Sequence, residues 1–82
     1  MQRLPVTSGR ELIKYLVKKG FVISRQRGSH VVLKSQDSRR VTVPLHEELD
    51  RGTLLEILAE AGISKEEFVR EWYEDDRNGK HD

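Results

Sequence analysis

The sequence of 82 residues has no cysteine, two prolines and few aromatic residues, which make up 6% of the chain. Without cysteine, neither a disulfide framework nor a thiolate zinc site can form. Charged residues interrupt every apolar run, so no stretch is long enough for a membrane span or a signal-peptide core. From these absences we expect a cytoplasmic, soluble protein. With 35% hydrophobic residues, the chain can build one small core, and we expect a single domain.

Acidic residues are scarce in the first half of the chain and basic residues are scarce in the second. The formal net charge of only +1 hides this difference. Residues 1–40 hold ten Lys and Arg against two Asp and Glu, whereas residues 41–82 hold five against twelve. A basic half suits a phosphate-rich partner, because Lys and Arg that neutralise phosphates release condensed counterions. The alternative is that the opposite charges of the two halves pair across the fold.

The first expected element is a helix over residues 9–19. Ser8 and Glu11 form the signature of a capping box, and apolar residues recur at helical spacing after it. Gly20 stands where a glycine commonly ends a helix. The pattern therefore predicts both ends of this helix.

Three short segments rich in β-branched residues follow, over residues 21–26, 30–34 and 40–43. Arg27-Gly28 is the expected turn between the first two, since glycine reaches positive φ without a Cβ penalty. Residues 35–39 form a polar turn, and Pro44 ends the third segment. We therefore expect a three-stranded antiparallel meander.

Alternation along these strands assigns each side chain to one of two faces. The side chains expected to face the core are those of Phe21, Ile23, Val31, Leu33, Val41 and Val43. The open face is expected to be polar and basic apart from Val22 and Val32, and its other members are Ser24, Gln26, His30, Lys34, Arg40 and Thr42. His30 therefore faces outward at a strand end among polar and basic neighbours, which favours a functional role over a buried one.

Two further helices are expected after a polar connection. Thr53 is the expected N-cap of the second helix, and Gly62 ends it. Ser64 and Glu67 form another capping-box pattern, which opens a short third helix. The sequence is wholly polar after Tyr73, so we expect one domain over residues 1–73 and a frayed tail over residues 74–82.

These elements predict an α+β fold, in which a helix, a three-stranded antiparallel sheet and a second helix are followed by a short C-terminal helix. With the helices on one face of the sheet, this arrangement is similar to a double-stranded RNA-binding domain. Such domains recognise RNA by its shape and by contacts with phosphates and 2′-hydroxyls.

The order of several motifs resembles that of HicA-type toxins. The motifs are Leu4-Pro5-Val6-Thr7-Ser8-Gly9-Arg10-Glu11-Leu12, Lys19-Gly20-Phe21, Gln26-Arg27-Gly28-Ser29-His30, Val41-Thr42-Val43-Pro44, His46, Gly52-Thr53-Leu54, Ala61-Gly62-Ile63-Ser64 and Glu67-Phe68. The resemblance implies a small mRNA interferase, independent of the ribosome, that is held inactive by a HicB-type antitoxin. It also implies that His30 is the catalytic residue and that Gly28 and Ser29 present it.

The residues themselves are consistent with this chemistry. RNA carries its own nucleophile in the 2′-hydroxyl, so a ribonuclease can work without metal if one group transfers a proton and cations stabilise the charge at phosphorus. His30 is the candidate for proton transfer. The candidates for phosphate contact are Arg27, Lys34 and Arg40, with Lys14 and Lys18 as weaker ones.

His46 is an auxiliary candidate. It precedes Glu47 and Glu48, but adjacent residues in a loop lack the fixed geometry of a metal site, so we expect neither a metal nor another cofactor. His46 is either a polar loop residue or a second proton donor beside His30, since a mechanism with one histidine leaves the other proton transfer unassigned.

Two other functions remain open beside the endoribonuclease toxin that we favour. A non-catalytic RNA-binding module of the same architecture would use His30 as one contact among many. A protein-binding adaptor would keep its RNA affinity unchanged when the cations are neutralised. For the toxin, we expect an antitoxin to cover the outer face around His30.

Overall fold

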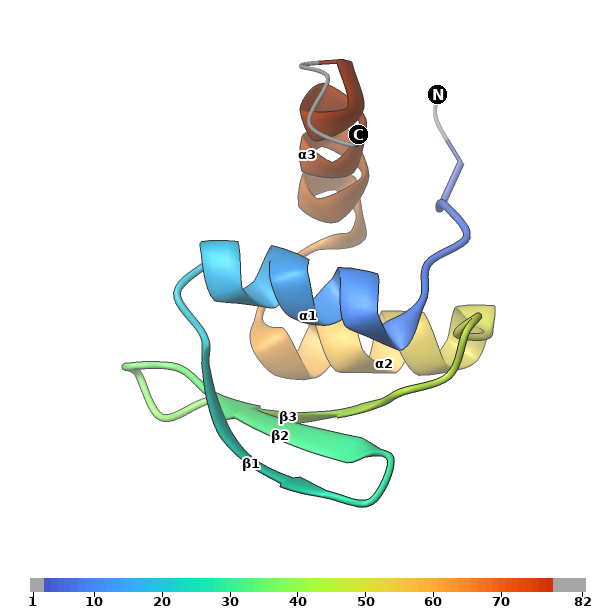
Figure 1. Cartoon of the computed structure of the whole chain (residues 1–82). Coiled ribbons are helices and arrows are strands. Elements are labelled where there is room, and N and C mark those ends of the chain that lie inside the picture. Colours follow the sequence, from blue (N-terminus) through green and yellow to red (C-terminus); the bar gives the residue numbers. More distant parts are fainter. Residues whose placement is uncertain (1–2, 78–82) are drawn as a thin grey trace.

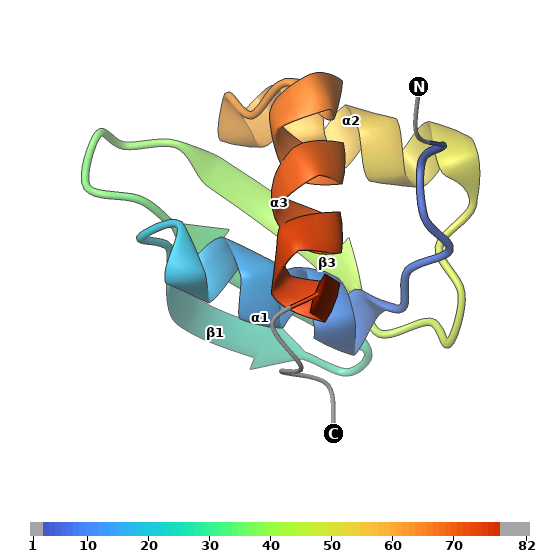
Figure 2. The same ribbon diagram turned by 90° about the horizontal axis from the view of Figure 1, so that it is seen from above.

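The computed structural model describes residues 3–77 of the chain. Its elements are α1 (Gly9–Lys18), β1 (Val22–Arg27), β2 (His30–Lys34), β3 (Arg40–Pro44), α2 (Arg51–Ala61) and α3 (Lys65–Arg77). The strands form one antiparallel sheet in the order β1-β2-β3. Helices α1 and α2 lie on one face of this sheet, and α3 crosses them on the side away from it (Figure 1, Figure 2). The expected α+β arrangement is therefore confirmed.

The first helix begins where the capping box predicts. The Glu11 N–H donates to Ser8 Oγ over 3.1 Å, and the Ser8 N–H donates to the Glu11 carboxylate over 3.0 Å. The helix ends at Lys18, one residue earlier than expected, with Lys19 as its C-cap. The cap therefore fixes the position of α1, which buries Leu12, Tyr15 and Leu16 in the core.

Most of the strand residues expected in the core are buried. Ile23 is the exception, because 54% of its surface is exposed, and the prediction for this residue was wrong. All six residues of β1 are exposed, so this edge strand lies outside the packed core. The buried members of the expected set are Phe21, Val31, Leu33, Val41 and Val43.

The second helix begins earlier than the sequence predicts. Asp50, not Thr53, is its N-cap, and the Asp50 carboxylate accepts a hydrogen bond of 2.7 Å from the Thr53 N–H. Aspartate is among the best N-cap residues, so this start follows a general preference. Gly62 ends α2 in the left-handed conformation, as expected.

The third helix is longer than expected, with 13 residues. The Glu67 N–H donates to Ser64 Oγ over 3.0 Å, which caps its first turn. The helix continues past Tyr73 to Arg77, and residues 78–82 of the expected tail lie outside the described residues. No helix in the described part of the chain, α3 included, is long and apolar enough to cross a membrane.

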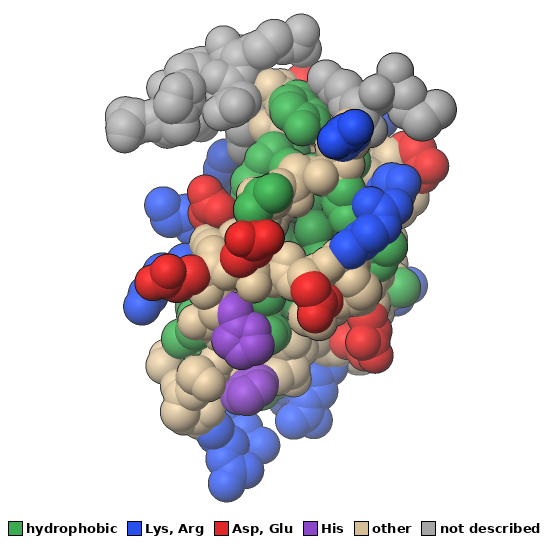
Figure 3. All heavy atoms as spheres, turned by 90° about the vertical axis from the view of Figure 1, so that its right-hand side faces the viewer, with side chains coloured by type: hydrophobic (Ala, Val, Ile, Leu, Met, Phe, Trp, Pro, Cys, Tyr) green, Lys and Arg blue, Asp and Glu red, His purple; other side chains and the backbone are tan. Residues whose placement is uncertain are grey.

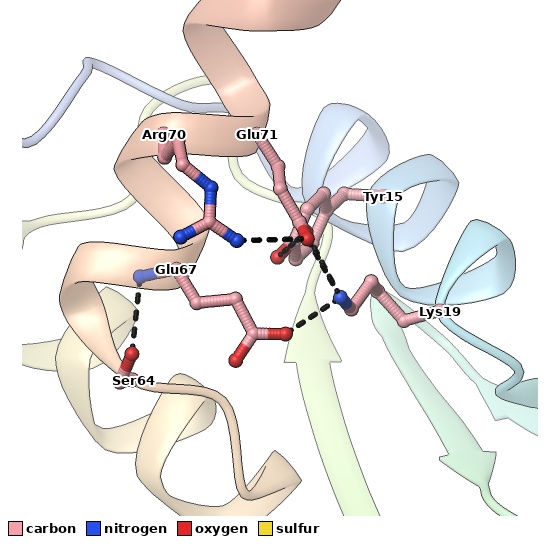
Figure 4. Close-up of polar contacts among 6 residues, drawn as sticks. All are labelled: Tyr15, Lys19, Ser64, Glu67, Arg70 and Glu71. Atoms are coloured by element: carbon pink, nitrogen blue, oxygen red, sulfur yellow. Dashed lines mark hydrogen bonds and ion pairs between the residues drawn. The ribbon is translucent and has the colours of Figure 1, made fainter.

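An aromatic and ionic cluster joins α3 to α1 (Figure 4). The fully buried Phe68 meets the Tyr15 ring edge to face, with the ring centroids 4.8 Å apart. The Tyr15 hydroxyl donates to Glu71 over 2.8 Å. Lys19 Nζ lies 2.6 Å from the Glu67 carboxylate and 2.9 Å from that of Glu71. These contacts place α3 as a third layer above α1.

The same contacts shift the pKa values of Tyr15, Lys19 and Glu71. Burial and the hydrogen bond to Glu71 raise the pKa of Tyr15 far above its ordinary value. The hydrogen bond with Glu67 is the main cause of a raised pKa at Lys19. Burial alone would raise the pKa of Glu71, but the hydrogen bonds from Lys19 and Tyr15 outweigh it and hold this pKa below its ordinary value.

We predict that Glu71→Gln lowers the free energy of unfolding at pH 7 by about 1 kcal/mol, the order expected of a partly exposed ion pair. Because the pKa of Glu71 is lower in the folded than in the unfolded state, its contribution is present above the unfolded-state pKa and is lost as pH falls through the folded-state pKa. Urea denaturation at several pH values should therefore show the variant and the unaltered protein converging in acid. Glu74→Gln, which changes an exposed residue of the same helix, is the control. A difference that is constant with pH would contradict the assignment.

Candidate functional site

The turn between β1 and β2 places His30 at the end of the hairpin. Gly28 and Ser29 form this turn, and Arg27 pairs with His30 across it, so the prediction of an Arg27-Gly28 turn was wrong by one residue. Gly28 has a φ of 57°, in the left-handed region that glycine favours. His30 is the first residue of β2 and its side chain is exposed.

A β-bulge in β1 decides which of its side chains share a face with His30. The register shifts between Ile23 and Arg25, and beyond this point Arg25 opposes Val32 and Gln26 opposes Val31. Residues directly opposite each other on paired strands point to the same face. Arg25 and Arg27 therefore lie on the face of His30, and the prediction of Gln26 there was wrong. We call this surface, on the side of the sheet away from α1 and α2, the outer face; its central members are Arg25, Arg27, His30, Val32, Lys34, Arg40, Thr42 and Pro44.

The outer face is strongly basic. Lys34 lies directly opposite Arg40, and like charges in this position destabilise a sheet. Among the ion pairs of the described residues, none includes Arg25, Arg27 or either of these two cations. The cations of the outer face are therefore available to an anionic partner.

An apolar residue lies beneath these cations. Val32 is only 7% exposed, yet it is not a member of the hydrophobic core between the sheet and the helices. Its neighbours on the adjacent strands are Arg25 and Thr42. Long basic side chains can cover apolar surface with their aliphatic stems, and the position of Arg25 directly opposite Val32 fits such cover.

Sequence reasoning did not single out Arg25. The signal was present, because a two-residue turn at Gly28-Ser29 sets Arg27 opposite His30 and Arg25 two positions behind it on the same face. The weaker candidates Lys14 and Lys18 belong to α1, which covers the opposite face of the sheet, so they do not join this group.

His46 lies in a segment that backbone hydrogen bonds hold against the hairpin turn and the start of α1. The Leu45 N–H donates to the Ser29 carbonyl over 2.7 Å, next to the position where Pro44 opposes His30. The His46 carbonyl accepts from the Gly9 N–H over 2.9 Å. Figure 3 shows the histidine side chains of the described residues next to each other on one surface. His46 is thus held near His30 and is not part of a loose loop.

Acidic side chains lie on one side of the histidines only. On the sheet side the charged side chains in view are Lys and Arg, whereas on the helix side Asp and Glu side chains lie among further Lys and Arg side chains (Figure 3). Asp50, the N-cap of α2, has a pKa that is lowered mainly by the hydrogen bond from the Thr53 N–H and further by the charge of His46. No three His, Asp or Glu side chains within the described residues are grouped so that they could hold a metal ion.

Two comparisons with known proteins point to toxin-antitoxin systems, and one of them names the family. A family model described as "HicA toxin of bacterial toxin-antitoxin" matches residues 9–63, from the start of α1 to just beyond α2. Among solved structures, a chain of the "Toxin-Antitoxin complex from Streptococcus pneumoniae" is similar, with 33% sequence identity and a TM-score of 0.61. That similarity covers 68% of this chain and 97% of the other. No curated protein gives a match.

We predict that Gly9→Ala destabilises the protein by about 1–3 kcal/mol, because an added Cβ would overlap with the Pro44 carbonyl oxygen and push against Leu45 Cα, 3.1 Å away. Gly52→Ala is the matched control, since a Cβ there meets only Asp50 Oδ1 at 3.8 Å. The control should be neutral or more stable by up to about 1 kcal/mol, because alanine favours a helix over glycine. Thermal and urea denaturation measure both, and equal effects would contradict the close approach at Gly9.

Proposed function

The chain belongs to the HicA toxin family of bacterial toxin-antitoxin systems, and on this premise we propose that it is an endoribonuclease that cleaves mRNA and is neutralised by a HicB-type antitoxin. The observation that carries the proposal is the position of His30. This histidine is exposed at the end of a hairpin, on an outer face whose other charged side chains are all cationic.

In the proposed reaction, the 2′-hydroxyl of the RNA attacks the adjacent phosphorus. The products are a 2′,3′-cyclic phosphate and a 5′-hydroxyl, and the protein supplies proton transfer and charge stabilisation. His30 takes part in proton transfer, since an imidazole changes its charge near neutral pH. Gly28 and Ser29 present it, because they form the turn that ends at His30.

The cations of the outer face bind the phosphates of the RNA. Arg27 is opposite His30, so its guanidinium is the cation best placed to contact the phosphate that reacts. Lys34 lies four residues further along β2, about 13 Å away for an extended strand, with Arg40 opposite it. These residues define a track for the RNA backbone along the sheet.

The proposed antitoxin covers the outer face around His30. The similar chain from Streptococcus pneumoniae comes from a toxin-antitoxin complex, which supports a protein partner for this chain. A partner with an acidic surface would be attracted by the same cations that bind RNA. It would therefore exclude the substrate while it is bound.

Cleavage of labelled single-stranded RNA tests the proposal. We predict that the unaltered protein cleaves RNA in the presence of EDTA and leaves a fully 2′-deoxy strand of the same sequence intact. His30→Ala, shown to be folded by circular dichroism, should lose cleavage by a factor of about 10² or more. If neither protein cleaves RNA but both bind it, the chain is a non-catalytic RNA-binding module and the proposed role of His30 is wrong.

The proposed RNA track predicts a change in the salt dependence of binding. In a His30→Ala background, which prevents cleavage, replacing both Arg25 and Arg27 with Gln should weaken RNA binding. The slope of log K against the logarithm of the salt concentration should fall by about 0.7 for each phosphate that the variant no longer neutralises. The control replaces Lys14 and Lys65, exposed residues of α1 and α3, with Gln. An affinity that is unchanged by the first pair would favour a protein-binding adaptor instead.

A further inference from the structure

Cleavage of RNA by its own 2′-hydroxyl is the function proposed above, and the inference that follows rests on it. This reaction requires two proton transfers. One group accepts the proton of the 2′-hydroxyl while the new P–O bond forms. Another group donates a proton to the 5′-oxygen while the P–O5′ bond breaks. The attacking and leaving oxygens lie on opposite sides of the phosphorus, so one imidazole is poorly placed to serve both. A second proton-transfer group is therefore expected near His30.

His46 is the group that the fold brings there. The Leu45 N–H is bound to the Ser29 carbonyl over 2.7 Å, so His46 follows directly on a residue tied to the hairpin turn. Figure 3 shows the histidine side chains side by side on the surface, and both residues are exposed. Within residues 3–77, no other side chain is a histidine.

The position of His46 is built into the fold. Its carbonyl accepts the Gly9 N–H over 2.9 Å, and three residues later the Leu49 N–H donates to the carbonyl of the buried Thr7 over 2.8 Å. Both partners belong to the chain at the start of α1. Residues that must act on the same phosphate need such fixed backbone positions, because small displacements reduce the rate strongly.

The surroundings of the two histidines differ in the sign of their charge. His46 lies near the Asp50 carboxylate, which attracts an imidazolium, whereas His30 lies opposite the guanidinium of Arg27. From these neighbours we assign proton donation to His46 and proton acceptance to His30.

We propose that His46 is the general acid of RNA cleavage, acting with His30 as the general base. The proton of the 2′-hydroxyl passes to the His30 imidazole as the 2′-oxygen bonds to phosphorus. The P–O5′ bond breaks, and the His46 imidazolium gives its proton to the departing 5′-oxygen. The products are the 2′,3′-cyclic phosphate and the 5′-hydroxyl, and exchange with water returns both histidines to their starting charge.

A substrate with a better leaving group tests this role. The probe is an oligoribonucleotide in which sulfur replaces the bridging 5′-oxygen at the position where the unaltered protein cuts the normal RNA. A thiolate is a much weaker base than an alkoxide, so it leaves without being protonated. His46→Ala should cleave the normal RNA about 10²–10⁴-fold more slowly than the unaltered protein. On the sulfur substrate, the same variant should come within a few-fold of the unaltered protein.

Three further variants separate this role from a structural one. His30→Ala should remain defective on both substrates, because sulfur does not replace the base. His46→Gln keeps a polar side chain and should show the same rescue as His46→Ala, while Glu48→Gln, in the same segment, should leave the ratio of the two rates unchanged. The proposal is wrong if His46→Ala cleaves normal RNA at the full rate, or if it is slowed equally on both substrates. If the unaltered protein does not cleave normal RNA at all, the proposed function fails and this inference fails with it.

Discussion

The close approach of two backbones, at Gly9 and at Pro44-Leu45, determines where the other parts of the site lie. Any Cβ at position 9 would overlap with the Pro44 carbonyl oxygen, so only glycine allows α1 to begin against the end of β3. The Gly9 N–H then binds the His46 carbonyl, and the Leu45 N–H binds Ser29 in the hairpin turn. One junction thereby connects a helix start, a strand end and the turn before His30. The backbone at the site is thereby held by these hydrogen bonds, although its side chains are exposed.

The parts of the fold that could be predicted from the sequence are those in which one residue type decides the local backbone. Ser8 with Glu11 sets the start of α1, and Gly62 ends α2, because caps depend on neighbours within a few residues. The bulge in β1 has no such signal. Phe21 points into the core and Arg27 points outward, yet they are six residues apart, and strict alternation would put them on the same face. One extra residue between them is required, and only the tertiary burial of Phe21 together with the true turn position reveals it.

In the fold, the cations of the basic half of the sequence divide into two groups with different surroundings. Part of the basic half does pair with the acidic half, because Lys19 binds Glu67 and Glu71 of α3. The cations of the outer face do not enter the ion pairs of the described residues, and Lys34 even lies opposite Arg40. A count of charges in the sequence cannot separate the paired cations from the unpaired ones, since the pairing depends on which residues α3 contacts in the fold. Pairing across the fold therefore accounts for the acidic residues of α3 that bind Lys19. The cations of the outer face stay available to a ligand.

The layering of the fold limits how a protein partner can inhibit the proposed reaction. One face of the sheet is covered by α1 and α2, and α3, which lies beyond the family match, crosses these helices from the other side. No described element covers the outer face. Backbone hydrogen bonds hold the strand start at His30 and the segment at His46, so within the described residues the histidines proposed to act on RNA do not lie on a loose segment that a partner could displace. Inhibition at this face would therefore act by occupying the cations and histidines that we propose to bind RNA, and RNA and the partner would compete for the same surface.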